Sequence, residues 1–405
     1  MAASDEIVRA YHELAAWCRE RDYAGHDPFD ALNSRLFQAT PFVRRSRAAR
    51  ILWTQLFKRS PVNLRRAALV PAGRNPKGTA LFTLAALARW RTTHSDEDER
   101  EARTLLDSLL ADRIQTASGA TAWGYNFDWQ SRAFFAPRGT PTVVPTAFAA
   151  RALVEAARDF SDDTYLRVAR RVCDFILRDL VRTVETSDEV CFSYTPLDRS
   201  RIFNASLLAA ETLAEVGART GEQELCAWAL RAARYVVRRQ RGDGSWAYGE
   251  QGFQGWTDNF HTAFILSSLW RISSACGVGV GAELTEAAQR GFEFWRGRFF
   301  LADGFPKYYH DEPYPADAHS AAAAIVTLVE KSARVDDALP ERRAALALAE
   351  QVASWTLDNL RDRRRGFFYY QRRRFYAVRT PYIRWAQAWM LYALARLIEG
   401  MKDEG

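Results

Sequence analysis

The chain has 405 residues, of which 48% are hydrophobic and 13% aromatic, and its 56 basic and 49 acidic residues give a formal net charge of +7. This length is large for one ordinary domain, but a closed array of repeated hairpins reaches it because each unit packs mainly on its neighbours. The basic excess suggests an acidic ligand, whereas the lack of a basic tail or a known recognition motif disfavours nucleic acid as a partner.

The expected compartment and the relation of the chain to a membrane follow from local features of the sequence. Five dispersed cysteines argue against a disulfide framework and favour a reducing compartment. The first residues lack a basic stretch followed by an apolar one, so we expect no signal peptide. No apolar run approaches the roughly 20 residues that a transmembrane helix needs. We therefore expect a cytoplasmic protein without a transmembrane segment.

Two kinds of helical segment alternate along the chain. Segments with one charged face are typical of outer helices, and they cover 96–113, 161–182, 222–240, 283–299 and 338–360. Segments rich in Ala and Leu with few charges are typical of inner helices, and they cover 76–91, 144–158, 202–218, 258–275, 316–331 and 381–399. A sixth outer helix is expected from the N-terminal region, at 5–21 or at 42–58.

This alternation predicts an all-α fold, an (α/α)6 toroid of six inner and six outer helices. We expect one domain over 1–405, in which residues 1–75 form an irregular helical segment that completes the ring. The connections from outer to inner helices are long and should all lie at one end: 22–75, 114–143, 183–201, 241–257, 300–315 and 361–380. Most of them contain a Gly-aromatic or aromatic-x-aromatic element, which predicts short β-hairpins at that end.

Two sequence resemblances support a toroid. The segment QRGDGSW at 240–246 resembles the QW repeat of the squalene-cyclase and prenyltransferase superfamily, whose fold is such a toroid. The acidic motifs Asp-x-Asp-Asp and Asp-Asp-x-x-Asp of those enzymes are absent. The segments HDPFDALNSR, SPVNLR, GRNPKG and WGYNFDWQSR resemble uncharacterised toroid proteins encoded among bacterial surface-polysaccharide genes. The second resemblance implies glycan chemistry of the kinds found on toroids, namely glycoside hydrolysis, uronyl epimerisation or polysaccharide cleavage by lyases.

Three carboxylates are candidate catalytic groups. Asp258 and Asp317 stand at the starts of inner helices, and Asp128 lies in a long connection between Phe127 and Trp129. Two carboxylates across a cavity can act as general acid and general base in glycoside hydrolysis. The alternative for Asp258 and Asp317 is helix capping, for which Asp is a favoured residue.

Other candidates could move a proton without a second carboxylate. His261 lies on the first turn of an inner helix and His319 occupies the equivalent position in the next repeat, so either could be a general base or a structural histidine. Tyr125 could exchange the proton at C5 of a uronate. Asp258, His261, His310 and His319 could also bind zinc, but no short ligand spacing supports a site, so we expect neither a metal nor a cofactor.

Aromatic, amide and basic residues of the long connections are candidates for substrate binding. Aromatic rings stack on the apolar faces of sugars, and guanidinium groups pair with carboxylate or phosphate. The alternative for many of the aromatic rings is packing between neighbouring connections. The candidates are Trp123, Asn126, Trp129, Arg132, Asn204, Trp246, Tyr248, Asn259, Tyr308, His319, Tyr382, Arg384 and Trp385.

These features predict a carbohydrate-active enzyme that acts on an acidic, uronate-containing oligosaccharide or a sugar-diphosphate-lipid precursor, as a hydrolase, a lyase or a uronyl C5-epimerase. Two alternatives remain, an isoprenoid cyclase or prenyltransferase and a non-catalytic glycan-binding assembly protein. No G-x-x-x-x-G-K-[ST], G-x-G-x-x-G or G-x-S-x-G motif occurs, which disfavours nucleotide hydrolysis, dinucleotide redox chemistry and α/β-hydrolase chemistry. The sequence leaves the oligomeric state open.

Overall fold

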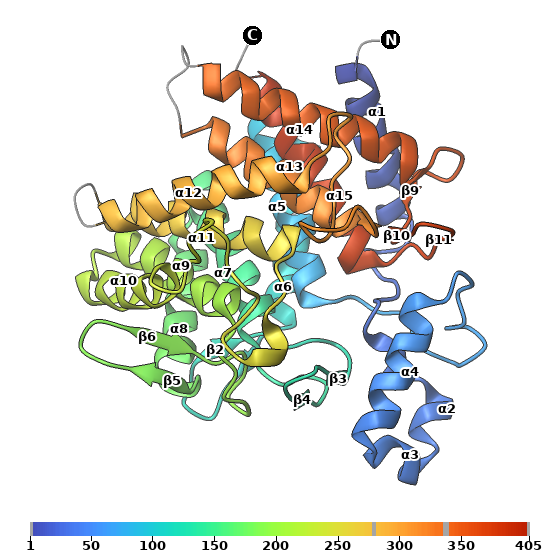
Figure 1. Ribbon diagram of the computed structural model, residues 1–405, viewed down its shortest axis with the longest axis horizontal. Coiled ribbons are helices and arrows are strands. Elements are labelled where there is room, and N and C mark those ends of the chain that lie inside the picture. The colour runs from blue at the N-terminus through green and yellow to red at the C-terminus, as the bar shows by residue number, and fades with distance from the viewer. Residues whose placement is uncertain (1–2, 278–280, 335–339, 403–405) are drawn as a thin grey trace.

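The computed structural model describes residues 3–277, 281–334 and 340–402. Two concentric layers of helices surround a common axis (Figure 1). The inner helices are buried on nearly all sides because their sequences carry few charges. Within the described ranges these six are α5 (Pro76–Thr93), α7 (Val143–Asp159), α9 (Phe203–Thr220), α11 (Asn259–Cys276), α13 (Ala318–Ser332) and α15 (Trp389–Lys402), the last preceded by a π-helical turn, η4 (Ile383–Ala388).

The outer layer alternates with the inner one along the chain. In the described residues its six helices are α1 (Ala3–Arg19), α6 (Asp96–Ala111), α8 (Asp163–Asp174), α10 (Gln223–Val237), α12 (Ala282–Phe299) and α14 (Pro340–Asn359). The ring closes because α15 packs against α5, while α1 packs against α15 and α14. The predicted toroid is therefore confirmed, and the sixth outer helix comes from 5–21, not from 42–58.

One predicted outer helix ends earlier in the structure than the sequence pattern suggests. The outer helix expected over 161–182 is too long at its end, since α8 passes into a π-helical turn, η2 (Phe175–Asp179), and Arg182 already pairs in a strand. The start of the outer helix expected over 338–360 lies outside the described residues.

Short antiparallel strands occupy several long connections, as predicted. The pairs are β1 (Ile114–Gln115) with β2 (Thr121–Ala122), β3 (Trp129–Gln130) with β4 (Phe135–Ala136), β5 (Arg182–Glu185) with β6 (Val190–Phe192), and β8 (Arg361–Asp362) with β9 (Phe367–Phe368). A three-stranded sheet has the order β11 (Ala377–Val378), β10 (Gln371–Arg372), β7 (Ala316–Asp317). Because β7 leads directly into α13, this sheet fixes the start of that inner helix.

The first long connection builds a separate helical projection. It contains a 3-10 turn, η1 (Asp30–Asn33), and the helices α2 (Arg35–Gln38), α3 (Pro41–Arg45) and α4 (Arg47–Arg59). These helices stand out from the ring below β10 and β11 in Figure 1, and α4 contacts β3. A further 3-10 turn, η3 (Gly252–Gln254), lies in the connection before α11. No helix in the described ranges is long and apolar enough to cross a membrane.

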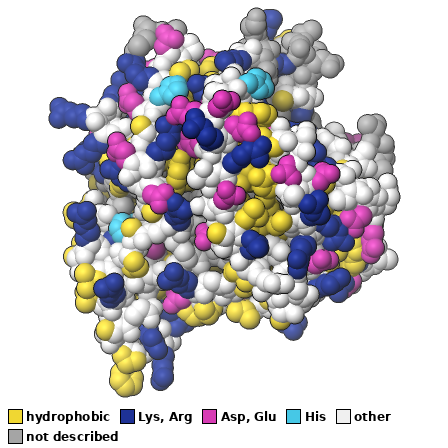
Figure 2. Space-filling model, turned by 180° about the vertical axis from the view of Figure 1, so that it is seen from behind, with side chains coloured by type: hydrophobic (Ala, Val, Ile, Leu, Met, Phe, Trp, Pro, Cys, Tyr) yellow, Lys and Arg dark blue, Asp and Glu magenta, His cyan; other side chains and the backbone are white. Residues whose placement is uncertain are grey.

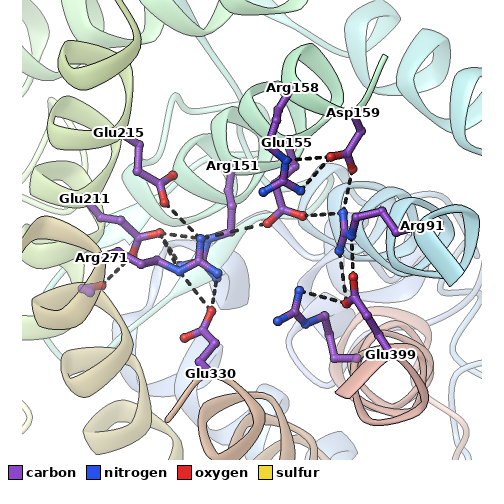
Figure 3. A network of polar contacts seen from close by, with 12 residues as sticks. Arg91, Arg151, Glu155, Arg158, Asp159, Glu211, Glu215, Arg271, Glu330 and Glu399 are labelled. Carbon is purple, nitrogen blue, oxygen red and sulfur yellow. Dashed lines mark hydrogen bonds and ion pairs between the residues drawn. The ribbon is translucent and has the colours of Figure 1, made fainter. Parts of the chain in front are cut away.

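Paired charges line the ring at the C-terminal ends of the inner helices (Figure 3), around a cavity of about 510 Å³. Arg271 of α11 donates from Nε to Glu330 at 3.0 Å and from Nη1 to Glu215 at 3.0 Å. Nearby, Arg151 donates from Nε to Glu211 at 2.8 Å. Burial opposes ionisation, yet the guanidinium groups of Arg271 and Arg151 lower the pKa of Glu330 well below its usual range. These charges are tolerated inside the ring because each has a partner of opposite sign.

We expect Arg271→Met to destabilise the protein strongly. The substitution leaves the buried Glu330 and Glu215 carboxylates without their main counter-charge, so the free energy of unfolding in urea should fall by about 3–5 kcal/mol. Arg298→Met, on the exposed side of α12, should change it by about 0.5 kcal/mol or less. Equal effects of the two substitutions would contradict this role for the network.

The same network predicts a loss of stability in acid. Because the pKa of Glu330 is lower in the folded chain than its ordinary 4.5, its ionisation stabilises the fold above that pH. This stabilising contribution of Glu330 disappears as the pH falls below 4.5 toward the pKa that Glu330 has in the folded chain. The free energy of unfolding of the wild type should therefore decrease on acidification below that pH, and the decrease should be shallower in Arg271→Met. Parallel curves for the two proteins would argue against the assignment.

Candidate functional site

A cavity of about 520 Å³ opens at the end of the ring where the inner helices begin. Five of the six long connections and the first turns of the inner helices contribute to its wall. The remaining connection, 361–380, supports the wall from behind, since Gln371 bonds to Asp317 beneath Trp385. The connections thus converge on one mouth, as expected from their common position after the outer helices.

Apart from tyrosines, the ionisable side chains of the cavity wall are mostly basic. In the described part of the chain, Asp258 is the sole carboxylate that lines it. The basic lining residues are Lys58, Arg59, Lys77, Arg132, Arg384, His261 and His319. Such a concentration of positive charge around a partly enclosed volume attracts anionic ligands.

Asp258 and His261 form a hydrogen-bonded dyad at the start of α11. Oδ1 of Asp258 accepts the backbone N–H of His261 at 3.0 Å and so caps the helix. Oδ2 lies 2.7 Å from His261 Nδ1 and also accepts Trp256 Nε1 at 3.0 Å. With Nδ1–H donated to the carboxylate, Nε2 carries the free lone pair, which is the arrangement of an oriented general base. The two functions proposed for Asp258, capping and catalysis, are therefore compatible.

His319 is a second imidazole in the cavity wall, and it is almost fully buried. The centroid of its ring lies 4.4 Å from the ring centroids of Phe260 and Trp385. Neither nitrogen of the His319 ring has a hydrogen-bond partner among the described residues. Burial and the nearby Lys77 lower the pKa of His319 well below its usual range. The ring is therefore neutral, with one N–H and one lone pair available to a ligand.

Two lysines of the wall were not singled out by the sequence analysis. Lys77 lies on the first turn of α5, with Nζ 4.5 Å from the Phe148 ring, and burial lowers its pKa well below the usual range. Lys58 of α4 lies with Nζ 4.4 Å from the Phe29 ring, and burial lowers its pKa to about 8. The signal for Lys77 was available, because a lysine at the start of a helix that is otherwise buried on all sides is unusual.

Arg384 enters the wall from η4 but is already paired. Its Nε and Nη2 donate to the two carboxylate oxygens of Asp27 at 2.6 and 2.8 Å, with both residues buried. Arg65 donates to Asp30 at 2.7 Å and to Tyr382 Oη at 2.7 Å. Asp27 and Asp30 come from the HDPFDALNSR segment, so this part of the sequence attaches the first connection to the last inner helix.

Most of the residues expected to act on substrate do line the cavity. Tyr248 stacks on Trp256 with a centroid distance of 4.6 Å, and Asn204 Oδ1 is buried without a partner in the described residues. Tyr125 Oη lies 3.3 Å from Tyr194 Oη. The predicted residues found in the wall are Tyr125, Trp129, Arg132, Asn204, Tyr248, Asp258, His261, Tyr308, His319, Arg384 and Trp385.

Two predicted carboxylates lie outside the wall. Asp128 accepts the backbone N–H of Arg138 at 2.8 Å and Gln38 Nε2 at 3.3 Å, so it faces the first connection. Asp317 caps α13, accepts Trp385 Nε1 at 3.0 Å and is fully buried, and this burial raises its pKa to about 6. The structure therefore does not bring either carboxylate to face Asp258 across the cavity.

Five predicted binding residues also lie behind the wall: Trp123, Asn126, Trp246, Asn259 and Tyr382. In the QRGDGSW segment, Gln240 Nε2 donates to the carbonyls of Gly244 and Ala287, and Trp246 Nε1 donates to Val236. A Cβ at Gly291 would overlap the Trp246 ring, so outer helix α12 approaches this ring closely. These contacts give the segment a packing role between successive repeats. Among the described residues, no three His, Cys, Asp or Glu side chains group together as metal ligands would.

Comparisons with known proteins support the architecture. No protein-family profile and no curated protein sequence matches the chain. Among solved structures, it is similar to an unsaturated glucuronyl hydrolase from Bacillus sp. GL1, with 18% identity, a TM-score of 0.58, and coverage of 81% of this chain and 88% of that one. It is also similar to cellobiose 2-epimerase from Bacillus thermoamylovorans B4167, with 13% identity, a TM-score of 0.60, and coverage of 82% and 88%.

A third similar structure is a sugar epimerase from a ruminal bacterium, with 14% identity, a TM-score of 0.62, and coverage of 82% of this chain and 88% of that one. At these identities the similarity establishes the α/α-toroid fold and leaves the reaction to be argued from the site.

Asp27→Ala should destabilise the protein because it leaves the Arg384 guanidinium buried without a counter-charge. The expected loss in the free energy of unfolding is about 3–5 kcal/mol, measured by urea denaturation. Asp188→Ala removes an exposed carboxylate that pairs with Arg234 at 3.2 Å and with Arg238, and it should destabilise the protein much less. If Asp27→Ala proves as stable as Asp188→Ala, the Asp27–Arg384 pair does not anchor the first connection.

Proposed function

We propose that this protein is a carbohydrate-active enzyme that removes the C5 proton of a uronic acid residue, as a C5-epimerase or a lyase. The observation that carries the proposal is the Asp258–His261 dyad in a cavity whose other ionisable groups are cationic or, like His319, neutral. In this scheme His261 Nε2 takes the proton, and Asp258 holds the ring and balances the charge of the resulting imidazolium. The enolate that remains regains a proton on the opposite face in epimerisation, or expels the substituent at O4 in elimination, where that oxygen takes up a proton.

The aromatic wall supports a sugar substrate. Tyr125, Trp129, Tyr248 and Tyr308 present large rings with polar edges, a combination that suits the apolar faces and hydroxyl groups of pyranose rings. The cavity volume of about 520 Å³ is within the range of small-molecule sites. A uronate with one neighbouring sugar residue is therefore the occupant that we propose.

The cationic wall supports a carboxylate on that sugar. Removal of the C5 proton places negative charge on the uronate carboxylate, so positive groups beside it stabilise the transition state. Arg132 and Lys77 are free of ion pairs in the described structure. A bound carboxylate next to Lys77 would also favour the charged ammonium, whose pKa burial otherwise lowers.

The same wall disfavours the other predicted reactions. Hydrolysis by the usual acid–base pair needs two facing carboxylates, and Asp258 has no carboxylate opposite it among the described lining residues. A carbocation of isoprenoid chemistry would be repelled by the basic side chains. A non-catalytic glycan-binding protein would not need an oriented carboxylate–imidazole dyad.

A second candidate is proton transfer at C2 of a reducing sugar, as in sugar epimerases and isomerases. His319 favours it, because a neutral imidazole with two unpartnered nitrogens could pass a proton to the face opposite His261. The centroid of the Phe260 ring lies 4.0 Å from that of the His261 ring and 4.4 Å from that of the His319 ring. Both imidazoles therefore belong to the same part of the cavity wall.

The test is to incubate the protein with glucuronate- and mannuronate-containing oligosaccharides in D2O. Deuterium at C5 of recovered sugar, seen by NMR, indicates epimerisation, and an unsaturated product with ultraviolet absorbance indicates elimination. His261→Asn should reduce either rate by about 10²- to 10⁴-fold, because it removes the general base.

His310→Asn is the matched control, since His310 lies outside the cavity wall, and it should retain wild-type turnover. Deuterium at C2 of the reducing residue would instead support the second candidate. The absence of both exchange at C5 or C2 and an unsaturated product, or full activity of His261→Asn, would refute the proposal.

A further inference from the structure

The projection formed by residues 35–66, here called the arm, exposes an unusual amount of apolar side chain. Six of the twelve large hydrophobic residues that are exposed in the described structure lie in these 32 residues. They are Leu36, Phe42, Val43, Leu52, Leu56 and Val62, with exposed fractions from 44% to 86%. Exposed hydrophobic residues concentrated in one small region mark an interaction surface.

The arm is also strongly basic. Its sequence carries nine basic residues and no acidic one. Arg65 pairs with the buried Asp30, but none of the other eight forms an ion pair with a described residue. Elsewhere on the protein exposed arginines do pair with acids, as Arg238 does with Glu189. The arm therefore presents uncompensated positive charge together with its apolar side chains.

The two faces of α4 have different environments. Thr54 and Phe57 are buried, and Lys58 lines the cavity. On the opposite face, Leu52 and Leu56 are exposed at a spacing of four residues, which places them on one stripe of the helix. One face of this helix thus closes the cavity while the other faces outward.

The turn between β10 and β11 forms an exposed tip beside the end of α4. Phe375, between β10 and β11, is 87% exposed, and the guanidinium of Arg374 lies 5.3 Å from its ring. Tyr376 Oη donates to the backbone carbonyl of Arg59 at 3.3 Å, which joins this tip to the arm. In Figure 2, hydrophobic and basic side chains occur together at the lower left corner, where the molecule narrows to a projection.

We propose that the arm docks on an anionic lipid membrane, with its apolar side chains among the headgroups and its arginines on lipid phosphates. The combination of exposed Phe and Leu side chains with unpaired basic residues and no acidic ones is that of an interfacial, surface-bound helix. A nucleic acid would use the arginines but would leave the apolar side chains in water. Because Lys58 and Arg59 of α4 line the cavity, docking places the cavity mouth near the headgroups. This inference does not depend on which reaction the cavity catalyses.

The experiment is co-sedimentation of the full chain with vesicles of equal parts phosphatidylglycerol and phosphatidylcholine, compared with vesicles of phosphatidylcholine alone. We expect binding to the anionic vesicles that weakens as salt is added. Arg44→Glu/Arg45→Glu should weaken it by at least roughly 30-fold, since each basic residue near such a surface contributes about a factor of five. Phe42→Ser/Leu52→Gln should weaken it by at least roughly tenfold through lost apolar burial.

The matched control is Arg100→Glu/Arg167→Glu, which makes the same charge change on outer helices α6 and α8, where both residues are exposed. It should bind vesicles like the wild type, and thermal unfolding should show that all variants are folded. No binding by the wild type, or equal binding by arm and control variants, would overturn the proposal. Loss of a wild-type oligomer in the arm variants without any vesicle binding would overturn it in favour of a second copy of the chain as the partner.

Discussion

The packing of the last inner helix, α15, against the first, α5, is the contact on which the rest of the structure depends. It turns a linear series of helical hairpins into a ring, in which the alternation of inner and outer helices makes all inner helices run in the same direction. Their N-termini therefore surround one opening and their C-termini the other. Each end of the ring can then carry a different chemistry, because the residues at the two ends of each inner helix never meet.

The two ends use charge in opposite ways. At the C-terminal end, arginines and glutamates from several inner helices neutralise one another, as Arg271 does with Glu330 and Glu215, and they line a second cavity of about 510 Å³. At the N-terminal end, several basic groups face the cavity without acidic partners. Since unpaired charge in a partly buried site is unfavourable without a ligand, the N-terminal end is suited to an anion, whereas the paired charges at the C-terminal end stabilise the fold.

Equivalent positions of the repeat have acquired different roles. Asp258 and Asp317 both cap inner helices through a backbone N–H. Asp317 is covered by Trp385 and Gln371, whereas Asp258 reaches the cavity and holds the imidazole of His261. The difference lies in the partners of each carboxylate: Asp317 bonds to an indole and an amide, whereas Asp258 also bonds to an imidazole that lines the cavity and can serve chemistry.

The sequence by itself determined the toroid, since helix character, alternation of inner and outer segments, and loop lengths are local properties of the chain. It also singled out Asp258 and His261 as separate candidates, and the structure shows that they bond to each other. Only the tertiary structure decided that Asp128 and Asp317 lie away from the cavity, that Lys77 and Lys58 line it, and that Arg384 pairs with Asp27. Those outcomes depend on contacts between residues far apart in the chain, as with Asp27 and Arg384, and on which side of a loop each side chain faces. Periodicity and spacing carry no information about either.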